Sequence, residues 1–222
     1  MATLPTPTAY SRSERRFAYI WKEISAQGDW RIPFQDLIAR YAEAHRRAHT
    51  INHIDDCLNL LWEKDVWRLA KEPLVVAAGL FYHDSVYDTL AHGGKNERES
   101  ANLMLKVYSA AGRQAFGLRA APMIIGTASH HDLEDADAQL TADIDTAGLA
   151  APWEKFKATS RAVREEYRSA YPDDKIFWLG NQRILGEFLE RPRIFQTDYF
   201  ENRFGPRARA NLKRATQPGY TG

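Results

Sequence analysis

The sequence predicts an all-α protein with a single domain. Apolar residues recur at steps of three and four along most of the chain, as Phe17, Ile20 and Ile24 do, and this is the spacing of one face of an amphipathic helix. No segment shows strict apolar and polar alternation between turn signals, which is the minimum sign of a half-buried strand. At 222 residues the chain is long enough for one well-filled core.

The expected helices follow one another at short intervals. Apolar steps over 17–24, 34–41 and 54–62 predict three amphipathic helices, the first ending near Gly28. Pro73 suits a first helical turn, and the apolar run that follows it predicts a helix buried on every side. Further helices are expected over 100–110, 118–129, 153–169, 175–189 and 201–215. They make one domain over 12–215, between a flexible leader (1–11) and a flexible tail (216–222).

Composition and charge argue against several classes of protein. Lysine and arginine total 30 against 29 acidic residues, and this net charge of +1 gives no reason to expect specific nucleic-acid binding. Cys57 is the single cysteine, which excludes an intramolecular disulfide and a thiolate-rich metal site. Because there is no signal-type start and no apolar run long enough to span a bilayer, we expect a cytoplasmic protein without membrane contact. Apolar helix faces fit either the core or a dimer interface, so the sequence does not exclude a homodimer.

An adjacent histidine and aspartate, His83 and Asp84, end the apolar run. They have little packing reason to be there, whereas imidazole and carboxylate together suit a divalent metal ion. Neighbours in a helix point about 100° apart, so both can reach one ion only near a helix end. His53 lies one predicted helix earlier, and Asp143 and Asp145 lie further along. We therefore expect a metal site made of His53, the His-Asp pair and one of these two acids.

This order of ligands resembles the HD superfamily of metal-dependent phosphohydrolases. The resemblance runs from about Tyr41 to Leu212 and is to small bacterial proteins described as predicted HD-superfamily metal-dependent phosphohydrolases. Their Tyr-x-Glu-x-x-Arg-x-Tyr-His segment is similar to Tyr41-Ala-Glu43-Ala-His45-Arg46-Arg47-Ala48-His49. The other similar segments are 81–88 around the His-Asp pair, 95–101, 127–130, 143–145, 164–167 and 208–212.

The resemblance implies an HD-type helical bundle that holds one divalent ion, or two, chosen from Mn, Ni, Zn, Mg and Fe. It implies the ligands His53, His83, Asp84 and Asp145. Asp145 is preferred to Asp143 because the similar segment places its acid at that end, although helical phasing could favour Asp143. Three residues depart from the family pattern: Ala48 for tyrosine, Thr50 for asparagine and Lys95 for aspartate. These changes alter the shape and charge of the pocket, and therefore the substrate.

Other histidines in the sequence could serve as ligands of a second metal ion. Dinuclear members of the superfamily use histidines between the His-Asp pair and the last aspartate, which makes His130 the candidate, ahead of His131 and then His92. A helix end that leads into an acidic loop at 132–137 explains the His-His pair equally well, because histidine complements the dipole there.

Three histidine positions offer an alternative metal site, which we call the rival histidine stripe. His45, His49 and His53 stand four residues apart and would share one face of an unbroken helix. That site would leave His83 and Asp84 without a partner, and His45 is otherwise expected to support the structure.

The expected reaction is hydrolysis of a small phosphorylated molecule, such as a nucleotide-like phosphomonoester or phosphoanhydride, through a metal-activated water. Glu97 is expected to handle the proton, or Asp88 in its place. The arginines expected to hold phosphate oxygens are Arg46, Arg164, Arg183 and Arg209. Two other classes fit the same residues: an HD-type di-iron oxygenase, and a non-catalytic, metal-stabilised ligand-sensing module.

Overall fold

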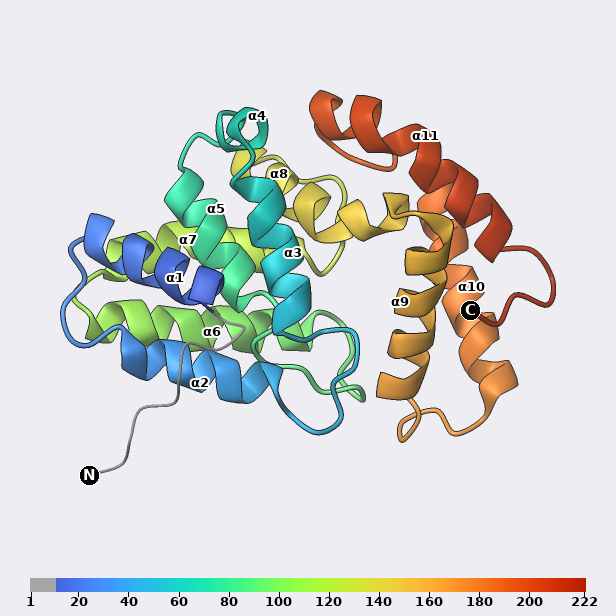
Figure 1. The fold of residues 1–222 in the computed structure, drawn as a ribbon, viewed down its shortest axis with the longest axis horizontal. Coiled ribbons are helices and arrows are strands. Elements are labelled where there is room, and N and C mark those ends of the chain that lie inside the picture. The colour runs from blue at the N-terminus through green and yellow to red at the C-terminus, as the bar shows by residue number, and fades with distance from the viewer. Residues whose placement is uncertain (1–10) are drawn as a thin grey trace.

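The structure, a computed structural model, describes residues 11–222 (Figure 1). The helices are α1 (Ser11–Glu23), α2 (Arg31–Tyr41), α3 (Ile51–Leu61), α4 (Lys64–Trp67), α5 (Pro73–Tyr82), α6 (Lys95–Ala110), α7 (Gln114–Gly126), α8 (Ala136–Thr146), the 3₁₀ helix η1 (Ala147–Ala150), α9 (Trp153–Glu166), α10 (Asp174–Glu190) and α11 (Asp198–Ala215). No strand occurs within these residues, which confirms the predicted all-α class. The predicted leader lies outside them, apart from its last residue.

Helix α8 is the main element that the sequence pattern did not predict. The acidic stretch 132–137 does not remain a loop throughout, because the Asp135 side chain accepts hydrogen bonds from the backbone N–H groups of Asp137 and Ala138 and so begins the helix. Every residue of α8 is at least partly buried, so the helix has no polar face for a periodic pattern to reveal. The start of α6 also differs, at Lys95 rather than at residue 100.

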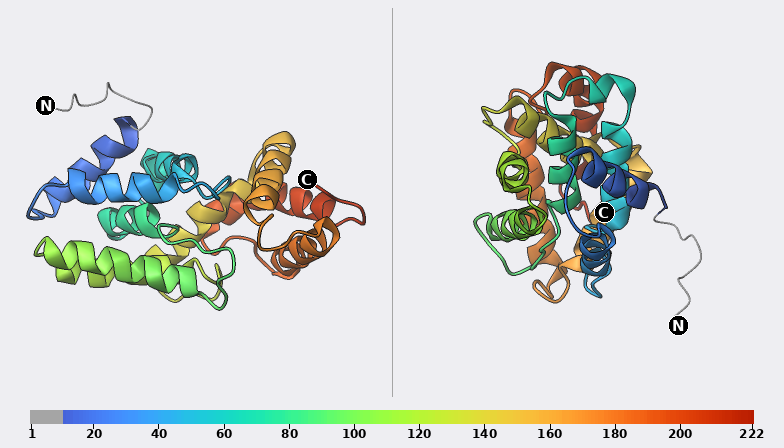
Figure 2. Two further views of the ribbon diagram at one scale, coloured as in Figure 1. Left: turned by 90° about the horizontal axis from the view of Figure 1, so that it is seen from below. Right: turned by 90° about the vertical axis from the view of Figure 1, so that its left-hand side faces the viewer.

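Helix α5 is the central helix of the molecule. It lies between the layer of α1 and α2 and the layer of α6 and α7 (Figure 2), and it also contacts α3 and α8. All its residues from Val75 to Tyr82 are buried. Gly79 permits the close approach of α7, because a Cβ atom at this position would lie 2.5 Å from the Cβ atom of Met123. None of the helices in residues 11–222 combines the length and the apolar character needed to cross a bilayer.

Two buried acids of α8 hold neighbouring elements by their backbone. Asp137 accepts hydrogen bonds of 2.7 and 2.9 Å from the N–H groups of residues 71–72, where α5 begins. Asp143 accepts bonds of 2.7 Å from both N–H groups of residues 196–197, just before α11. Charge-assisted bonds of this kind satisfy N–H groups that a helix start leaves unpaired. Helix α8 therefore fixes both the N-terminal end of α5 and the start of α11.

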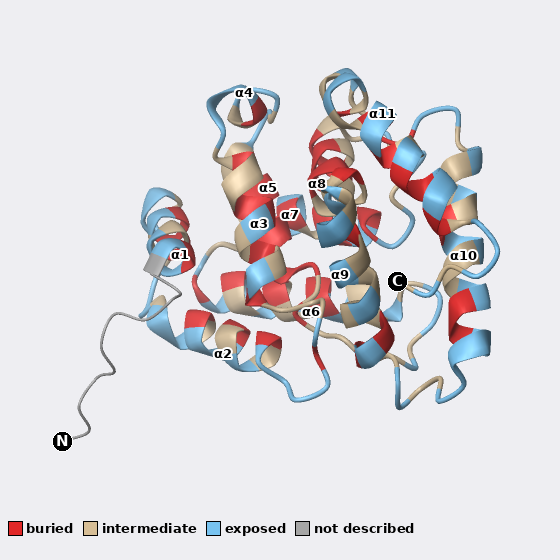
Figure 3. Ribbon diagram, turned by 45° about the vertical axis from the view of Figure 1, so that its right-hand side comes forward, coloured by how far each residue is buried: buried red, intermediate tan, exposed pale blue. Residues whose placement is uncertain are grey.

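Helices α9, α10 and α11 form the C-terminal side of the molecule. The buried residues of α11 follow one side of the helix (Figure 3), and among them Asn211 donates to the carbonyls that flank the end of η1, at 2.9 and 2.8 Å. Residues 216–222, expected to be a flexible tail, make side-chain contacts: the Tyr220 ring lies 5.8 Å from the rings of Trp153 and Trp178. Its hydroxyl donates to Ser160.

The close approach of α5 and α7 makes Gly79 a sensitive position. We expect Gly79→Ala to lower the free energy of unfolding by about 1–3 kcal/mol, because the added methyl group overlaps Met123. In Gly186→Ala, in α10, a new Cβ atom meets nothing within 4 Å, so that change should be neutral or stabilising by up to about 1 kcal/mol. Urea unfolding of both variants checks this. Equal stability of the two would show that α5 and α7 do not lie this close.

Candidate metal centre

His83 and Asp84 stand where α5 ends. The backbone N–H of His83 donates to the Gly79 carbonyl at 2.9 Å and closes the last turn, and Asp84 follows it outside the helix. The Nδ1 atom of His83 lies 2.9 Å from the Leu80 carbonyl oxygen. Nδ1 therefore carries the proton of the neutral ring, and Nε2 presents a lone pair. The helix end lets these neighbouring side chains face the same point, as the sequence argument required.

Donor atoms from three distant stretches of the chain meet at this helix end. His53 Nε2, from α3, lies 3.2 Å from His83 Nε2 and 2.8 Å from Asp145 Oδ1. Asp145 belongs to α8, and the same oxygen is 3.2 Å from His83 Nε2. Asp84 Oδ2 lies 3.1 Å from His83 Nε2 and 3.8 Å from His53 Nε2. We call His53, His83, Asp84 and Asp145 the His-Asp cluster.

Burial and charge oppose each other in the His-Asp cluster. Burial alone would lower the pKa of His83, but Asp84 and Asp145 outweigh it and hold that pKa well above its ordinary value. Burial would raise the pKa of Asp145, but His83, His130 and His53 hold it well below the usual range. The carboxylates therefore stay ionised, and they draw positive charge into the cluster, either as protons on the imidazoles or as a bound cation.

The donor set fits a divalent metal ion. Imidazole nitrogen and carboxylate oxygen bind first-row ions at roughly 2.0–2.2 Å, so atoms that share an ion stand roughly 3 Å apart or slightly more. Asp84 Oδ2 is buried, and it makes no hydrogen bond with the described residues although His83 Nε2 lies 3.1 Å away, which is costly for a carboxylate oxygen unless a cation lies close. The group of His53, His83 and Asp145 could hold a metal ion, and Asp84 adds a further oxygen beside it.

Asp143, the alternative ligand, takes no part in this group. Its carboxylate is engaged with the backbone ahead of α11 and with the Thr197 hydroxyl, at 2.6 Å. Asp145 lies two residues further along α8, on another side of the helix, as helical geometry requires. The structure thus separates two acids that the sequence alone left as alternatives.

His130 brings another imidazole to the His-Asp cluster. Its Nε2 atom lies 2.7 Å from Asp145 Oδ2, while the other Asp145 oxygen faces His53. The backbone of His130 is left-handed, with φ of 57°, which is costly for a residue with a Cβ atom. Arg191 holds this backbone by donating to the His130 carbonyl at 3.2 Å. His131 is exposed and pairs with its neighbour Asp132 instead.

A second polar group, which sequence reasoning did not single out, borders the cluster. Buried Glu166, at the end of α9, accepts a hydrogen bond from His49 Nδ1 with one oxygen. Its other oxygen accepts from the backbone N–H groups of residues 47–49, at 2.7, 2.9 and 3.1 Å. The His49 ring stacks on Tyr87 with centroids 4.3 Å apart, and the Tyr87 and Tyr167 hydroxyls are 2.9 Å apart. The sequence signals for this group were the similarity of segments 41–49 and 164–167 to the HD superfamily and the place of His49 in the rival histidine stripe.

The carboxylate of Glu166 is ionised in this arrangement. Burial acts to raise its pKa, but the hydrogen bond and charge of His49 and the N–H groups of residues 47–48 outweigh it and lower that pKa to about 2. An ionised partner on Nδ1 keeps a proton there. His49 therefore presents Nε2 toward the Tyr87 hydroxyl, 3.5 Å away.

The four arginines expected to hold phosphate contact the protein's own groups. Arg46 is buried and donates to the carbonyls of His49 and Asp84, at 3.1 and 2.7 Å, so it joins the loop before α3 to the end of α5. Arg164 binds Asp174 and the carbonyls of residues 171–172. Arg209 donates to carbonyls at the end of α10, and exposed Arg183 pairs with Glu187.

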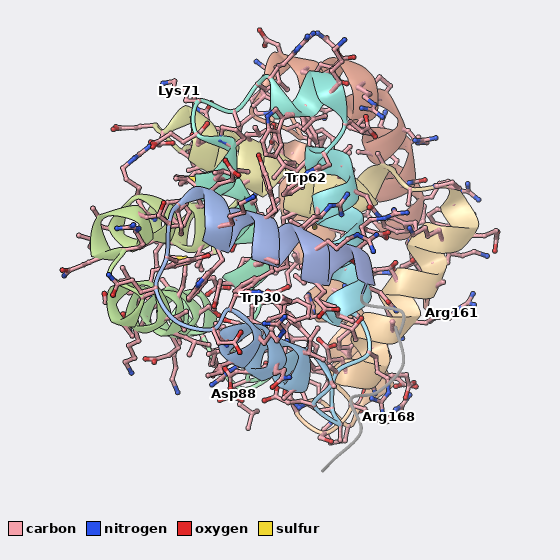
Figure 4. The ribbon with its side chains drawn as sticks, turned by 60° about the vertical axis from the view of Figure 1, so that its left-hand side comes forward. Trp30, Trp62, Lys71, Asp88, Arg161 and Arg168 are labelled. Carbon is pink, nitrogen blue, oxygen red and sulfur yellow. The ribbon has the colours of Figure 1, made fainter. Side chains whose placement is uncertain are left out.

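Neither acid expected to handle a proton belongs to the cluster. Asp88 is exposed (Figure 4), and its side chain accepts from the backbone N–H of Leu90 in a turn. Glu97 lies in the first turn of α6. The rival histidine stripe is wrong, because α3 begins at Ile51 and so His45 and His49 do not share a helix with His53. His45 instead contacts the Tyr87 carbonyl, at 3.0 Å.

The cluster opens into a cavity of about 680 Å³, a size that falls in the roughly 300–1,000 Å³ range of ligand pockets. One end is lined by His49, His53, His130 and Asp145, and exposed His92 also borders it. An apolar wall comes from α9 and α10 and includes Phe156, Val163, Phe177, Leu185 and Phe188. It reaches the histidines, because the Phe188 ring lies 6.2 Å from the His130 ring. The candidate metal centre therefore faces a space that is large enough for a small-molecule ligand.

Comparisons with protein-family models, with curated proteins and with solved structures found no match to this chain. The geometry of the site itself is that of a candidate metal centre beside a ligand-sized cavity. The HD-superfamily resemblance stays a prediction from the sequence.

We expect a divalent ion to stabilise the protein through the His-Asp cluster. An ion that binds only the folded state contributes about 2.7 kcal/mol at 100 times its dissociation constant. Thermal unfolding of chelator-treated protein with added Mn²⁺, Ni²⁺, Zn²⁺, Mg²⁺ or Fe²⁺ should show this shift, and Asp145→Asn should lose it. His130→Ala should weaken metal binding more than His131→Ala, because His130 contacts Asp145 whereas His131 does not. An unchanged shift in Asp145→Asn would place the ion elsewhere.

Glu166 should contribute to stability in a pH-dependent way. We expect Glu166→Gln to lower the free energy of unfolding by about 2 kcal/mol at neutral pH, because the ionised carboxylate accepts buried hydrogen bonds. The folded-state pKa of about 2 is below the ordinary value of 4.5. The contribution is therefore complete above about pH 4.5 and is lost as the pH falls toward 2. Urea unfolding at pH 7 and pH 3.5 measures it. Glu165→Gln, at an exposed neighbour paired with Arg168, is the control; an equal loss there would refute the role of Glu166.

Proposed function

We propose that this protein is a metal-dependent phosphohydrolase whose ion is held by His53, His83, Asp84 and Asp145. The observation that supports this most directly is the meeting of His53 Nε2, His83 Nε2 and Asp145 Oδ1 within 3.2 Å of one another, at one end of a cavity of about 680 Å³. The order of these residues along the chain, and the similar segments around them, favour the HD superfamily. Mixed imidazole and carboxylate ligands are typical of hydrolytic metal sites.

When bound there, a divalent ion would lower the pKa of a coordinated water toward about 7 and polarise a phosphoryl oxygen. The protein's own residues prepare the site for this chemistry. The Leu80 carbonyl fixes the tautomer of His83, and Glu166 fixes that of His49. His49 lies beside His53 on the cavity wall, with ring centroids 6.2 Å apart. We infer that His49, rather than Glu97 or Asp88, accepts or donates the proton.

One observation favours a second candidate function. His130 Nε2 lies beside Asp145 Oδ2, whereas His53 and His83 lie beside Asp145 Oδ1. Both oxygens of Asp145 therefore have imidazole neighbours, as expected for a carboxylate that would serve two ions. This arrangement favours an HD-type di-iron oxygenase over a non-catalytic module. Elemental analysis separates the candidates, because the oxygenase requires two irons per chain and uptake of oxygen in the presence of substrate.

The phosphohydrolase is tested by phosphate release from a panel of nucleotides, sugar phosphates and simple phosphomonoesters. We expect turnover that depends on added metal and that falls by at least about 100-fold in His53→Ala and in Asp145→Asn, since each loses a ligand. His131→Ala should keep wild-type activity, because this exposed side chain contacts only Asp132. Phosphate release that survives both ligand changes would remove the proposed site from the reaction.

A further inference from the structure

We propose that the substrate carries a single anionic head on a bulky apolar body, so that its phosphomonoester reaches the His-Asp cluster while the wall of α9 and α10 holds the apolar alcohol part. This inference rests on the proposed function for the reaction, but its account of the cavity stands on separate observations. It replaces the nucleotide-like substrate that the sequence suggested.

The first observation is the distribution of positive charge. Among the described residues, no lysine or arginine lines the cavity. Arg161, Arg164, Arg168 and Lys175 instead line a groove that also involves α9 and α10 but contains none of the cluster residues. Figure 4 shows Arg161 on α9 and Arg168 just beyond the end of that helix. Nucleoside diphosphates and triphosphates carry several negative charges, which proteins normally meet with arginine, lysine or metal ions. To an anion the cavity offers its histidines and one candidate metal centre but no lysine or arginine among the described residues, which suits one anionic group.

The second observation is the apolar character of the wall. Phe156, Val163, Phe177, Leu185 and Phe188 face the cavity from α9 and α10. Two of the hydroxyl groups in the wall are already engaged: Thr146 donates to the Ala142 carbonyl at 2.7 Å, and Ser160 to the Phe156 carbonyl at 3.2 Å. The amide of Asn181, whose side-chain oxygen is buried without a hydrogen-bond partner among the described residues, is a polar group that a ligand can still meet. A ligand in this space therefore meets mainly hydrocarbon and aromatic surface along α9 and α10.

The third observation lies at the edge of the cavity. Ile176 and Ile184 of α10 line it while keeping 60% and 55% of their surface exposed. Exposed apolar side chains beside a ligand pocket gain from burial under an apolar ligand. They add exposed apolar surface to the wall that the body of such a substrate would cover.

The test uses the metal-loaded full chain and a series of ethyl, butyl, hexyl and octyl phosphates, with AMP and ATP for comparison. Burial of one methylene group is worth roughly a fourfold change in an equilibrium or in kcat/KM, so kcat/KM should rise about 3- to 4-fold per added methylene until the wall is covered. Octyl phosphate should exceed AMP and ATP. A preference for AMP or ATP, or no dependence on chain length, would overturn the inference.

A matched pair of variants locates the apolar body. Ile184→Gln, at the cavity, should lower kcat/KM for octyl phosphate at least about 5-fold and leave ethyl phosphate nearly unchanged. Leu179→Gln is the control, because Leu179 is 58% exposed on the same helix but lines the basic groove instead. Equal losses in the two variants would contradict the assignment. Both residues are exposed and the replacement is uncharged, so neither misfolding nor charge repulsion of the phosphate imitates the result.

A binding measurement separates this inference from the proposed reaction. Octylphosphonate, which has no ester bond to hydrolyse, should bind the wild-type chain and bind Ile184→Gln more weakly, as calorimetry can show. If no ester is hydrolysed but this binding pattern holds, the phosphohydrolase assignment fails and the apolar-ligand site stands. If octylphosphonate does not bind, or binds both chains equally, the inference about the cavity fails.

Discussion

One constraint governs the site: the two largely buried carboxylates of Asp84 and Asp145 lie within 3.2 Å of imidazole nitrogens. Like charges at Asp84 and Asp145 cannot persist there without positive charge between them. The protein meets this constraint with histidines from α3, the end of α5 and the segment after α7. The electrostatics of the cluster and its suitability for a cation are thus two aspects of the same arrangement.

The His-Asp cluster stays together only if the backbone next to each of its side chains is fixed. Most of the residues that fix this backbone are charged. Arg46 joins the loop before α3 to the carbonyl of Asp84, and Glu166 binds the N–H groups of residues 47–49. Asp137 holds the other end of α5. Each of these side chains is itself buried. The segments that resemble the HD superfamily therefore include Arg46 and Glu166, which position the cluster, as well as the candidate ligands His83, Asp84 and Asp145.

The sequence predicted the helices with a clear polar face, and it predicted that His83 and Asp84 would need a helix end. It did not predict α8, because a helix whose acids are all at least partly buried has no polar stripe. For the same reason the choice between Asp143 and Asp145 needed the structure, since both are acids on one helix and only their surroundings differ. Arg46 and Arg164 could not be told from phosphate-binding residues, because an arginine that binds backbone carbonyls leaves no periodic signal. His49 depends on Glu166, more than one hundred positions away, and no local pattern links them.

The bond between Glu166 and the N–H groups of residues 47–49 has a mechanical consequence. It ties α9, one wall of the cavity, to the loop that leads directly into α3 and His53. An outward movement of α9 would break the hydrogen bonds of the buried Glu166 carboxylate or displace α3, which carries His53. This wall is therefore unsuited to open and close the cavity. The α10 side, where Ile176 and Ile184 already meet solvent, is thus the part of the cavity wall that can move without disturbing the His-Asp cluster.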